Sequence, residues 1–333
     1  MNNLKDAAAA INAANHVAII QAENPDGDSL GSALALEEII GALGKKISLY
    51  CPVDIPKYLR YAHGWDRISD ELAIDADVYI IVDTASKTLM EKALIPENIA
   101  QLKKKPVIVI DHHVTEGDLP FDHILLAEAA AIATSEIIYD FAVHNKWKIT
   151  DQAAENIMLA MLSDSLGLSS EATTAKSMRV MGDLIDLGAH PSEIDTRRKE
   201  FMKKSPEILA YKGRLIERVE YHLEGKLALV HIPWDEISKY SDQYNPSMLV
   251  LDEMRLVKGV KLGVALKTYP DGKITGKIRA NPEAKIAEKV ASYFGGGGHP
   301  FAAGFRIYED YDSTLNELIG AVDKILRDYD ATA

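Results

Sequence analysis

Acidic side chains and imidazoles stand directly after several apolar segments in the first half of this 333-residue sequence. In chain order they are Asp26, Asp28, Asp83, Asp111, His112, His113 and Asp164. A charged group at the end of a buried segment is costly unless a partner satisfies it, and a divalent cation is such a partner. The residue types and their positions therefore predict a metal site.

The ligand types indicate which metal and which chemistry. Carboxylates with a few imidazoles suit Mn²⁺ or Mg²⁺ better than zinc, which prefers more nitrogen or sulfur. Two carboxylates separated by one residue, as in Asp26-Gly27-Asp28, can reach two neighbouring ions, and a third such as Asp83 can bridge them. Two ions about 3.5–4 Å apart hold the attacking water and the leaving oxygen of an in-line displacement. That chemistry is the hydrolysis of a phosphate ester.

Some of these signals have a structural explanation when taken alone. Asp26 and Asp28 could cap a helix that starts near Ser29, and Asp83 could cap the next helix together with Thr84. Two adjacent histidines after an apolar strand and an aspartate are harder to explain by capping. The signals together, in this order, favour the metal site.

Short β-branched runs alternate with helical patterns in this part of the chain. The runs are apolar throughout, as in strands of a sheet that is covered on both faces. Strand–helix–strand repetition implies a mainly parallel sheet, which binds ligands at the carboxyl ends of its strands. The predicted strands are 16–20, 47–50, 78–82 and 107–110, and the predicted helices are 29–43, 87–103, 128–145 and 151–163.

The second half predicts a smaller α/β domain after a polar helical stretch at about 176–218, which indicates connecting helices. Its predicted strands are 226–232, 259–267, 273–279 and 301–307, and its predicted helices are 234–240, 246–253, 283–293 and 313–328. The fold class is therefore α/β throughout.

A run of four glycines, Gly295 to Gly298, precedes His299. Successive glycines expose backbone N–H groups that can wrap an anion closely, and the imidazole adds a donor. The alternative is a flexible turn between a helix and a strand. Arg279, at the end of a predicted strand, can stack on a base or bind a phosphate, or it is an exposed strand-end charge.

Composition restricts the class of protein. The formal net charge is −13, whereas a protein that binds long duplex nucleic acid usually shows a basic face. The single cysteine, Cys51, excludes a disulfide within the chain and a cysteine-based zinc site. The N-terminal residues lack a signal-peptide pattern, and no apolar run approaches the roughly 18 residues that span a bilayer. We expect a cytoplasmic protein that does not bind membranes.

These motifs resemble those of the DHH phosphoesterases. Asn24-Pro25-Asp26-Gly27-Asp28, Asp83, Asp111-His112-His113 and Asp164 look like the four motifs of that superfamily, and Gly295 to Phe305 is similar to the signature of its DHHA1 domain. The superfamily includes RecJ-type exonucleases, oligoribonucleases, phosphoadenosine-phosphate phosphatases, cyclic-dinucleotide phosphodiesterases and family II pyrophosphatases. The resemblance implies a DHH catalytic domain at 1–185, connecting helices at 186–218 and a DHHA1 substrate-binding domain at 219–333.

The resemblance also implies roles for single residues. Asp26 and Asp83 would hold one ion, and Asp28, Asp83, His112 and Asp164 would hold a second, with two Mn²⁺ expected and Mg²⁺ as an alternative. His113 would contact the scissile phosphate, and Asp111 would orient an imidazole. The residues implied in substrate binding are Arg279, Gly296, Gly297, Gly298 and His299.

One position departs from the family pattern. Most members carry a histidine four residues before the first aspartate of the first motif, where this chain has Ala22. Three outcomes are open: a water completes the shell, Glu23 reaches in, or the first ion binds weakly. We expect a weakened but usable first site.

The length of the chain favours the short oligoribonuclease or phosphoadenosine-phosphate phosphatase type over a RecJ exonuclease. We therefore expect hydrolysis of short single-stranded RNA or DNA, of linear dinucleotides such as pApA, or of 3'-phosphoadenosine 5'-phosphate, to mononucleotides. The alternative is a nucleotide-binding sensor with little or no turnover, because Ala22 replaces a metal-ligand histidine. Dimers occur in the family, so a homodimer is compatible with the resemblance.

Overall fold

Five parallel strands form the first sheet, in the order β2-β1-β3-β4-β5. The computed structural model describes residues 2–113 and 117–331. The strands are β1 (His16–Ile20), β2 (Lys46–Tyr50), β3 (Val78–Val82), β4 (Val107–Asp111) and β5 (Ile124–Ala127). The predicted parallel sheet is confirmed, and β5 is an additional short strand that the sequence analysis missed.

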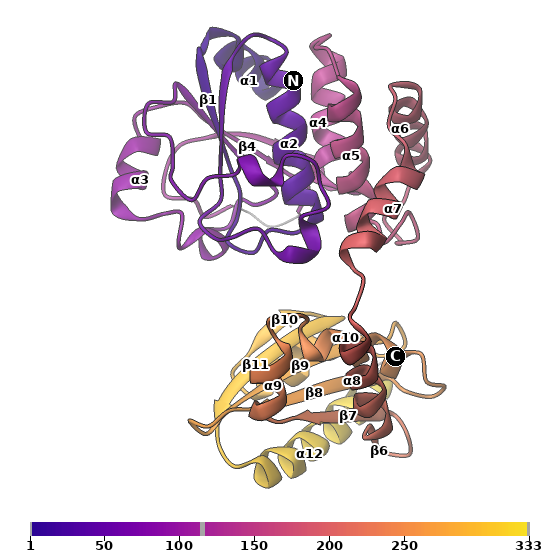
Figure 1. Ribbon diagram of the computed structural model, residues 1–333. Coiled ribbons are helices and arrows are strands. Elements are labelled where there is room, and N and C mark those ends of the chain that lie inside the picture. The colour runs from indigo at the N-terminus through magenta and orange to yellow at the C-terminus, as the bar shows by residue number, and fades with distance from the viewer. Residues whose placement is uncertain (1, 114–116, 332–333) are drawn as a thin grey trace. The chain divides into compact units, whose positions relative to one another are not determined.

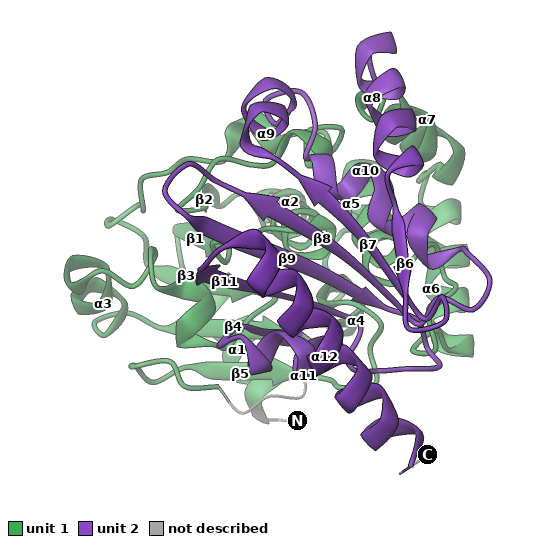
Figure 2. Cartoon of the chain, turned by 90° about the horizontal axis from the view of Figure 1, so that it is seen from below, with its two compact units in different colours: residues 1–203 green, residues 204–333 purple. Residues whose placement is uncertain are grey.

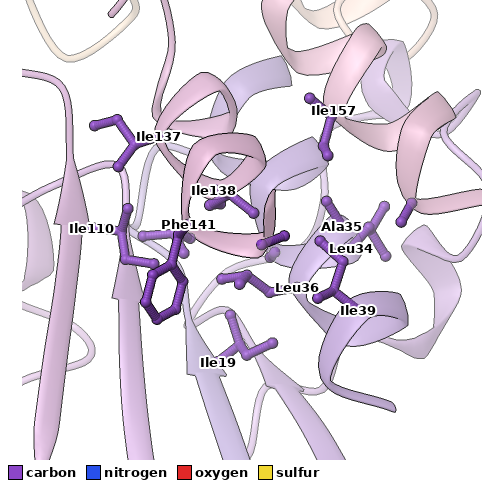
Figure 3. Packing of buried hydrophobic residues seen from close by; sticks show 14 of the residues in the cluster. Ile19, Leu34, Ala35, Leu36, Ile39, Ile110, Ile137, Ile138, Phe141 and Ile157 are labelled. Atoms are coloured by element: carbon purple, nitrogen blue, oxygen red, sulfur yellow. The ribbon is translucent and has the colours of Figure 1, made fainter. Parts of the chain in front are cut away.

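Helices cover both faces of this sheet, as Figure 1 shows for α3 on one side and α4 and α5 on the other. The larger core lies between the sheet and α2, α4 and α5, and Figure 3 shows part of it, with Ile19 and Ile110 of the strands near Leu36 and Phe141. The helices are α1 (Asn2–Ala13), α2 (Gly27–Gly41), α3 (Pro96–Leu102), α4 (Thr134–His144), α5 (Asp151–Asp164), α6 (Ala175–Asp186) and α7 (Pro191–Phe201), with 3-10 turns at Lys57–Leu59, Trp65–Arg67 and Lys87–Met90.

Two predicted helices differ from the structure. The helix predicted at 87–103 is a 3-10 turn followed by α3, which begins at Pro96 because proline lacks the N–H that a continuous helix would need there. The helix predicted at 128–145 begins only at Thr134, where its first backbone N–H groups donate to Asp28.

Six strands form a separate mixed sheet in the order β10-β11-β9-β8-β7-β6. Only β7 and β8 pair in parallel, and the other neighbours are antiparallel. The strands are β6 (Glu220–His222), β7 (Leu227–Ile232), β8 (Leu262–Thr268), β9 (Lys273–Ala280), β10 (Gly297–His299) and β11 (Ala302–Tyr308). The helices are α8 (Pro206–Glu217), α9 (Trp234–Tyr240), α10 (Pro246–Arg255), α11 (Ala287–Tyr293) and α12 (Tyr311–Asp330).

The chain divides into two compact units, residues 1–203 and 204–333, coloured green and purple in Figure 2. Each unit has its own apolar cores: α8, α9 and α10 pack on one face of the second sheet, and α11 and α12 pack on the other. In the stretch predicted as connecting helices, α7 falls in the first unit and α8 in the second. None of the helices in the described ranges is long and apolar enough to cross a membrane.

Candidate metal centre

The strand order reverses between β1 and β3, and the predicted site residues lie at this point. In a doubly wound sheet, ligands bind outside the carboxyl ends of the strands where neighbouring connections leave in opposite directions. Asp26 and Asp28 follow β1, Asp83 follows β3, and Asp111 is the last residue of β4. The topology therefore explains why acids that are far apart in sequence meet at one edge of the sheet.

Asp28 is buried and is bonded to the start of another helix. Its carboxylate accepts from the backbone N–H groups of Thr134 at 2.6 Å and Ser135 at 3.3 Å, and from the hydroxyl of Ser32 at 3.1 Å. The N-cap residue of α4, Ala133, has no capping side chain, so Asp28 satisfies N–H groups that a helix start leaves without partners. The positive end of the α4 dipole also stabilises the anion.

Asp83 adopts an unusual backbone conformation, with φ at 64°. A left-handed non-glycine residue costs free energy, and such residues occur preferentially at functional sites. The side chain is 8% exposed, and its Oδ1 accepts a hydrogen bond from the Thr134 hydroxyl at 3.0 Å. The 3-10 turn that follows, Lys87–Met90, has Ser86 as its N-cap and no side-chain cap, so the structural alternative in which Asp83 caps the next helix is wrong.

His112 directs one ring nitrogen at three carboxylates. Its Nε2 lies 3.8 Å from Asp28 Oδ2, 3.7 Å from Asp83 Oδ1 and 3.6 Å from Asp164 Oδ2. These distances are too long for hydrogen bonds. The other nitrogen, Nδ1, lies 3.3 Å from the carbonyl oxygen of Ala131, which can only accept a proton. In the neutral ring this contact leaves the Nε2 lone pair facing the carboxylates.

These distances match those around a bound cation. Ligand atoms at 2.0–2.1 Å from one octahedral ion are about 3–4 Å apart. Ligand atoms of Asp83, His112 and His113 also lie within 4.8 Å of one another. The donor set of several carboxylate oxygens and one or two imidazoles, with a carbonyl behind one ring, fits a divalent ion such as Mn²⁺ or Mg²⁺.

His113 is held by the aspartate that begins the tripeptide. Its Nδ1 lies 2.7 Å from Asp111 Oδ1, which also accepts the backbone N–H of His113 at 3.1 Å. Asp111 is buried, whereas the His113 side chain is 49% exposed. The hydrogen bond to Asp111 raises the pKa of His113. Asp111 therefore fixes the His113 ring through Nδ1, while the remainder of the ring is accessible to solvent.

Asp26 and Asp164 complete the cluster from two neighbouring helices. Asp26 is the N-cap of α2 and accepts from the N–H groups of Asp28 and Ser29, so its capping role is real. Asp164 ends α5. A Cβ at Gly27 would lie 2.0 Å from Ser163 Oγ, so glycine at this position lets α2 and α5 approach closely. That approach brings Asp164 toward the other acids.

Repulsion among the acids is visible in their pKa values. Burial raises the pKa of Asp28, Asp83 and Asp164, and neighbouring carboxylates raise the values further. The pKa of Asp164 rises to about 6. Buried acids that crowd together are stabilised in their ionised form when a cation lies among them.

Ala22, which stands where most members of the resembled family have a histidine, is buried. Ala22 is 6% exposed, and its carbonyl oxygen lies 3.5 Å from the buried Cys51 sulfur. The Glu23 carboxylate accepts the backbone N–H of Lys92 at 2.9 Å, which ties it to the segment after β3. Of the three outcomes left open by the sequence, the one in which Glu23 replaces the missing imidazole therefore has no support in this geometry.

The predicted substrate residues of the second unit lie on β9 and β10. Arg279 is half-buried near the end of β9, and its guanidinium donates to the carbonyl of Ile278 at 3.1 Å. Gly297, Gly298 and His299 form β10, and the structure describes the backbone of His299 but not its side chain. A Cβ at Gly296 or Gly298 would meet β11 backbone atoms at 2.2 or 2.6 Å, whereas one at Gly297 would meet nothing within 4 Å.

Sequence reasoning missed one residue of the first site, Thr134. It is fully buried, and it donates to Asp28 through its amide and to Asp83 through its hydroxyl. A threonine followed by Ser135 and Glu136 at a helix start was the available signal. The helix was predicted to begin earlier, which placed Thr134 in its interior and hid this role.

Comparison with known proteins defines the class. Residues 16–162 match the DHH family, N-terminal domain, and relatives that align along most of the chain carry the name of an oligoribonuclease and PAP phosphatase. The protein is a phosphoester hydrolase. The first unit carries a DHH-family domain, as its motifs predicted.

Several relatives are named "Bifunctional oligoribonuclease and PAP phosphatase NrnA", and two of them cover most of the chain as follows. The one from Thermus thermophilus is 26% identical over 305 residues, covering 90% of this chain and 86% of the relative. The one from Bacillus subtilis is 24% identical over 299 residues, covering 88% and 90%. A solved structure of an exopolyphosphatase-related protein from Bacteroides fragilis has the same fold, with a TM-score of 0.85, 20% identity, and coverage of 98% of this chain and 96% of that one.

Proposed function

We propose that this protein hydrolyses short nucleotide substrates to mononucleotides with the help of divalent cations. The substrates are short single-stranded oligonucleotides, linear dinucleotides such as pApA, and 3'-phosphoadenosine 5'-phosphate. The observation that carries the proposal is the His112 Nε2 facing Asp28, Asp83 and Asp164 at 3.6–3.8 Å. The names of the relatives support the choice of substrates.

In this proposal Asp26, Asp28, Asp83, His112 and Asp164 would hold the Mn²⁺ ions, two of which are expected, and Asp83 would serve both. When bound, the ions supply an activated water and stabilise the leaving oxygen. The protein contributes rigid ligands, because Thr134 fixes two carboxylates and the Ala131 carbonyl fixes the His112 ring. Mg²⁺ would use the same carboxylate ligands and would bind imidazole less strongly.

His113 contacts the scissile phosphate in this mechanism. Asp111 holds its Nδ1, so the ring has one orientation and its exposed side is available to a substrate oxygen. In the second unit, Arg279, Gly296, Gly297, Gly298 and His299 bind substrate. Gly297 is best suited to a direct backbone contact, because a Cβ at that position would meet open space.

The test is a substrate panel with Mn²⁺. We expect release of AMP from pApA and of phosphate from 3'-phosphoadenosine 5'-phosphate, and loss of both in Asp83→Asn and His112→Ala. Lys258→Gln, an exposed position in the second unit, serves as the control that retains activity. A folded protein that turns over none of these substrates with Mn²⁺ or Mg²⁺ would refute the proposal.

A second candidate is a sensor that binds nucleotides without turnover. The burial of Ala22 and the engagement of Glu23 by Lys92 favour it, because neither residue supplies the missing ligand of the first ion. The variant Ala22→His separates the two candidates. A hydrolase with a weakened first site gains activity and Mn²⁺ affinity, whereas a sensor binds nucleotide tightly and gains no turnover.

A further inference from the structure

Four cationic side chains gather around one face of the second sheet. They are Lys267 of β8, Lys277 and Arg279 of β9, and Arg255 at the end of α10. The strands that carry them are neighbours, and their order can be followed in Figure 2. Lys267 and Lys277 have no role in the function proposed above.

The register places the two lysines on the same face. Lys277 and Arg279 are two residues apart on β9, so their side chains leave the same side, while Ile278 between them packs into the core beneath α11 and α12. Lys267 pairs with Thr275, which is the next residue on that face of β9. Lys267 and Lys277 are therefore diagonal neighbours, about 7–8 Å apart, which is within reach of their long side chains.

The residues beside Lys277 are small. It pairs with Ala265 of β8 and with Gly304 of β11, and Gly304 in turn pairs with Gly297 of β10. Strands lie about 4.8 Å apart, so Gly297 and Lys277 are about 10 Å apart with a glycine between them. Gly304 and Gly297 carry no side chains and are not buried, so the backbone on the β11 side of Lys277 is accessible to a ligand, whereas Ala265 on the β8 side is buried.

Lys267 is buried and Lys277 is half-buried, and neither faces an opposite charge. Lys267 is 8% exposed, and its Nζ donates to Asn245 Oδ1 at 2.8 Å. Burial and then the charge of Lys277 lower the pKa of Lys267 to about 8. Burial and then Arg279 lower the pKa of Lys277. Within residues 2–113 and 117–331, no carboxylate acts on the pKa of either lysine.

Arg279 and Arg255 continue this series of like charges. Burial lowers the pKa of Arg279, Asp252 raises it and Arg255 lowers it. Asp252 is mostly exposed and lies 3.8 Å from Arg255. Its one charge cannot balance both arginines and the two lysines. Buried like charges cost free energy unless a counter-charge offsets them.

We propose that Lys277 and Lys267 form, beside Arg279, a subsite that binds a phosphate group. The assignment of that phosphate to a nucleotide rests on the proposed function, whereas the binding of an anion at this face does not. The lysines act as point charges on a flexible stem, which suits a phosphate that Arg279 alone does not neutralise.

The test uses the full chain after its metals have been removed by chelation and dialysis. Calorimetric titrations with pyrophosphate, 3'-phosphoadenosine 5'-phosphate and adenosine are compared at constant ionic strength. The variants are Lys277→Gln, the charge-retaining Lys277→Arg, and Lys258→Gln as an exposed control in the same unit. We expect the affinity for both phosphate ligands to fall on the order of tenfold in Lys277→Gln and to be retained in the other two.

Thermal unfolding without ligand provides the second readout. Lys277→Gln should unfold at the same temperature as the wild type or higher, because the substitution removes an uncompensated charge. A lower unfolding temperature combined with unchanged affinity would identify a structural lysine and overturn the proposal. Equal loss of affinity in Lys258→Gln, or equal loss for adenosine, would also overturn it.

Failure of the proposed function has a different signature. A chain that hydrolyses no nucleotide but binds pyrophosphate through Lys277 refutes the function and leaves the subsite standing. If the protein hydrolyses pApA but Lys277→Gln binds pyrophosphate as tightly as the wild type, the subsite alone is refuted.

Discussion

The hydroxyl of Thr134 donates a hydrogen bond to Asp83, with 3.0 Å between the two oxygen atoms. The amide of the same threonine donates to Asp28 at 2.6 Å. One residue at the start of α4 therefore fixes carboxylates from two different loops. Because the two bonds use different groups, a substitution can remove the first and keep the second.

The variant Thr134→Val tests this link. Valine has a similar shape but no hydroxyl, so Asp83 loses its donor while the amide bond to Asp28 remains. We expect turnover with Mn²⁺ to fall about tenfold and Mn²⁺ affinity to fall about 10–100-fold, as for other groups that orient metal ligands. Thr134→Ser should keep most of both. Equal kinetics and equal calorimetric Mn²⁺ affinity in the wild type and Thr134→Val would contradict this role.

A second prediction concerns the close approach of α2 and α5. In Gly27→Ala the new Cβ would lie 2.0 Å from Ser163 Oγ and 2.4 Å from its Cβ, so the helices must separate. We expect a loss of about 1–3 kcal/mol in the free energy of unfolding, together with lower activity, because Asp164 moves with α5. Urea unfolding measures the first effect, and turnover measures the second.

The double variant Gly27→Ala/Ser163→Gly provides the control. Removing the serine side chain removes both clashing atoms, so the two substitutions should be coupled in a double-mutant cycle. Additive losses would show that the Cβ at position 27 acts on something other than Ser163.

Substitutions at two neighbouring glycines should affect different properties, stability at Gly298 and substrate binding at Gly297. A Cβ at Gly298, which has φ at 143°, would lie 2.6 Å from the Ala302 carbonyl oxygen, whereas Gly297 faces open space. Gly298→Ala should therefore lower the unfolding temperature. Gly297→Ala should leave it unchanged and raise KM several-fold, because the new methyl group occupies space that we assign to substrate. An unchanged KM in Gly297→Ala would remove this glycine from the substrate site.

The buried Lys267 predicts a pH dependence of stability. Its pKa falls from the ordinary 10.5 to about 8 in the folded protein, so the unfolded chain binds more protons between these values. The free energy of unfolding of the wild type therefore rises with pH across that window. In Lys267→Met the cost of the buried charge is absent, so the variant should gain most over wild type below about pH 8, and the gain should shrink toward pH 10.5. Urea unfolding of both proteins across this range measures the difference, and a constant difference would contradict the assignment.

Most of the fold could be predicted because its signals are local. The apolar runs at 16–20 and 78–82 are β1 and β3 with the predicted bounds, and 234–240 is α9. Short elements such as β5, β6 and β10 were missed, since three or four residues carry too little periodicity to stand out. The single helix predicted at 87–103 was wrong because Pro96 starts a new helix instead of continuing one.

The residue types of the site could be predicted from the sequence, but the hydrogen bonds and backbone conformations that hold those residues could not. Acids after strands are visible in the sequence, and the resemblance of the motifs supplied the rest of the list. The donors from Thr134 depend on contacts 51 and 106 residues away, and the left-handed conformation of Asp83 has no glycine to signal it. The strand order that brings these loops together is likewise a property of the folded sheet.

The distribution of the candidate ligands along the chain has a consequence for folding. Asp28 comes early, His112 much later, and Asp164 only at the end of α5, so no short fragment contains the whole set. An unfolded chain offers no assembled site, and affinity for the ion therefore develops with the tertiary structure. During synthesis, the nascent polypeptide should begin to retain Mn²⁺ only after α5 has left the ribosome and packed against α2. Ion uptake would then report the maturation of the first unit, independently of the second.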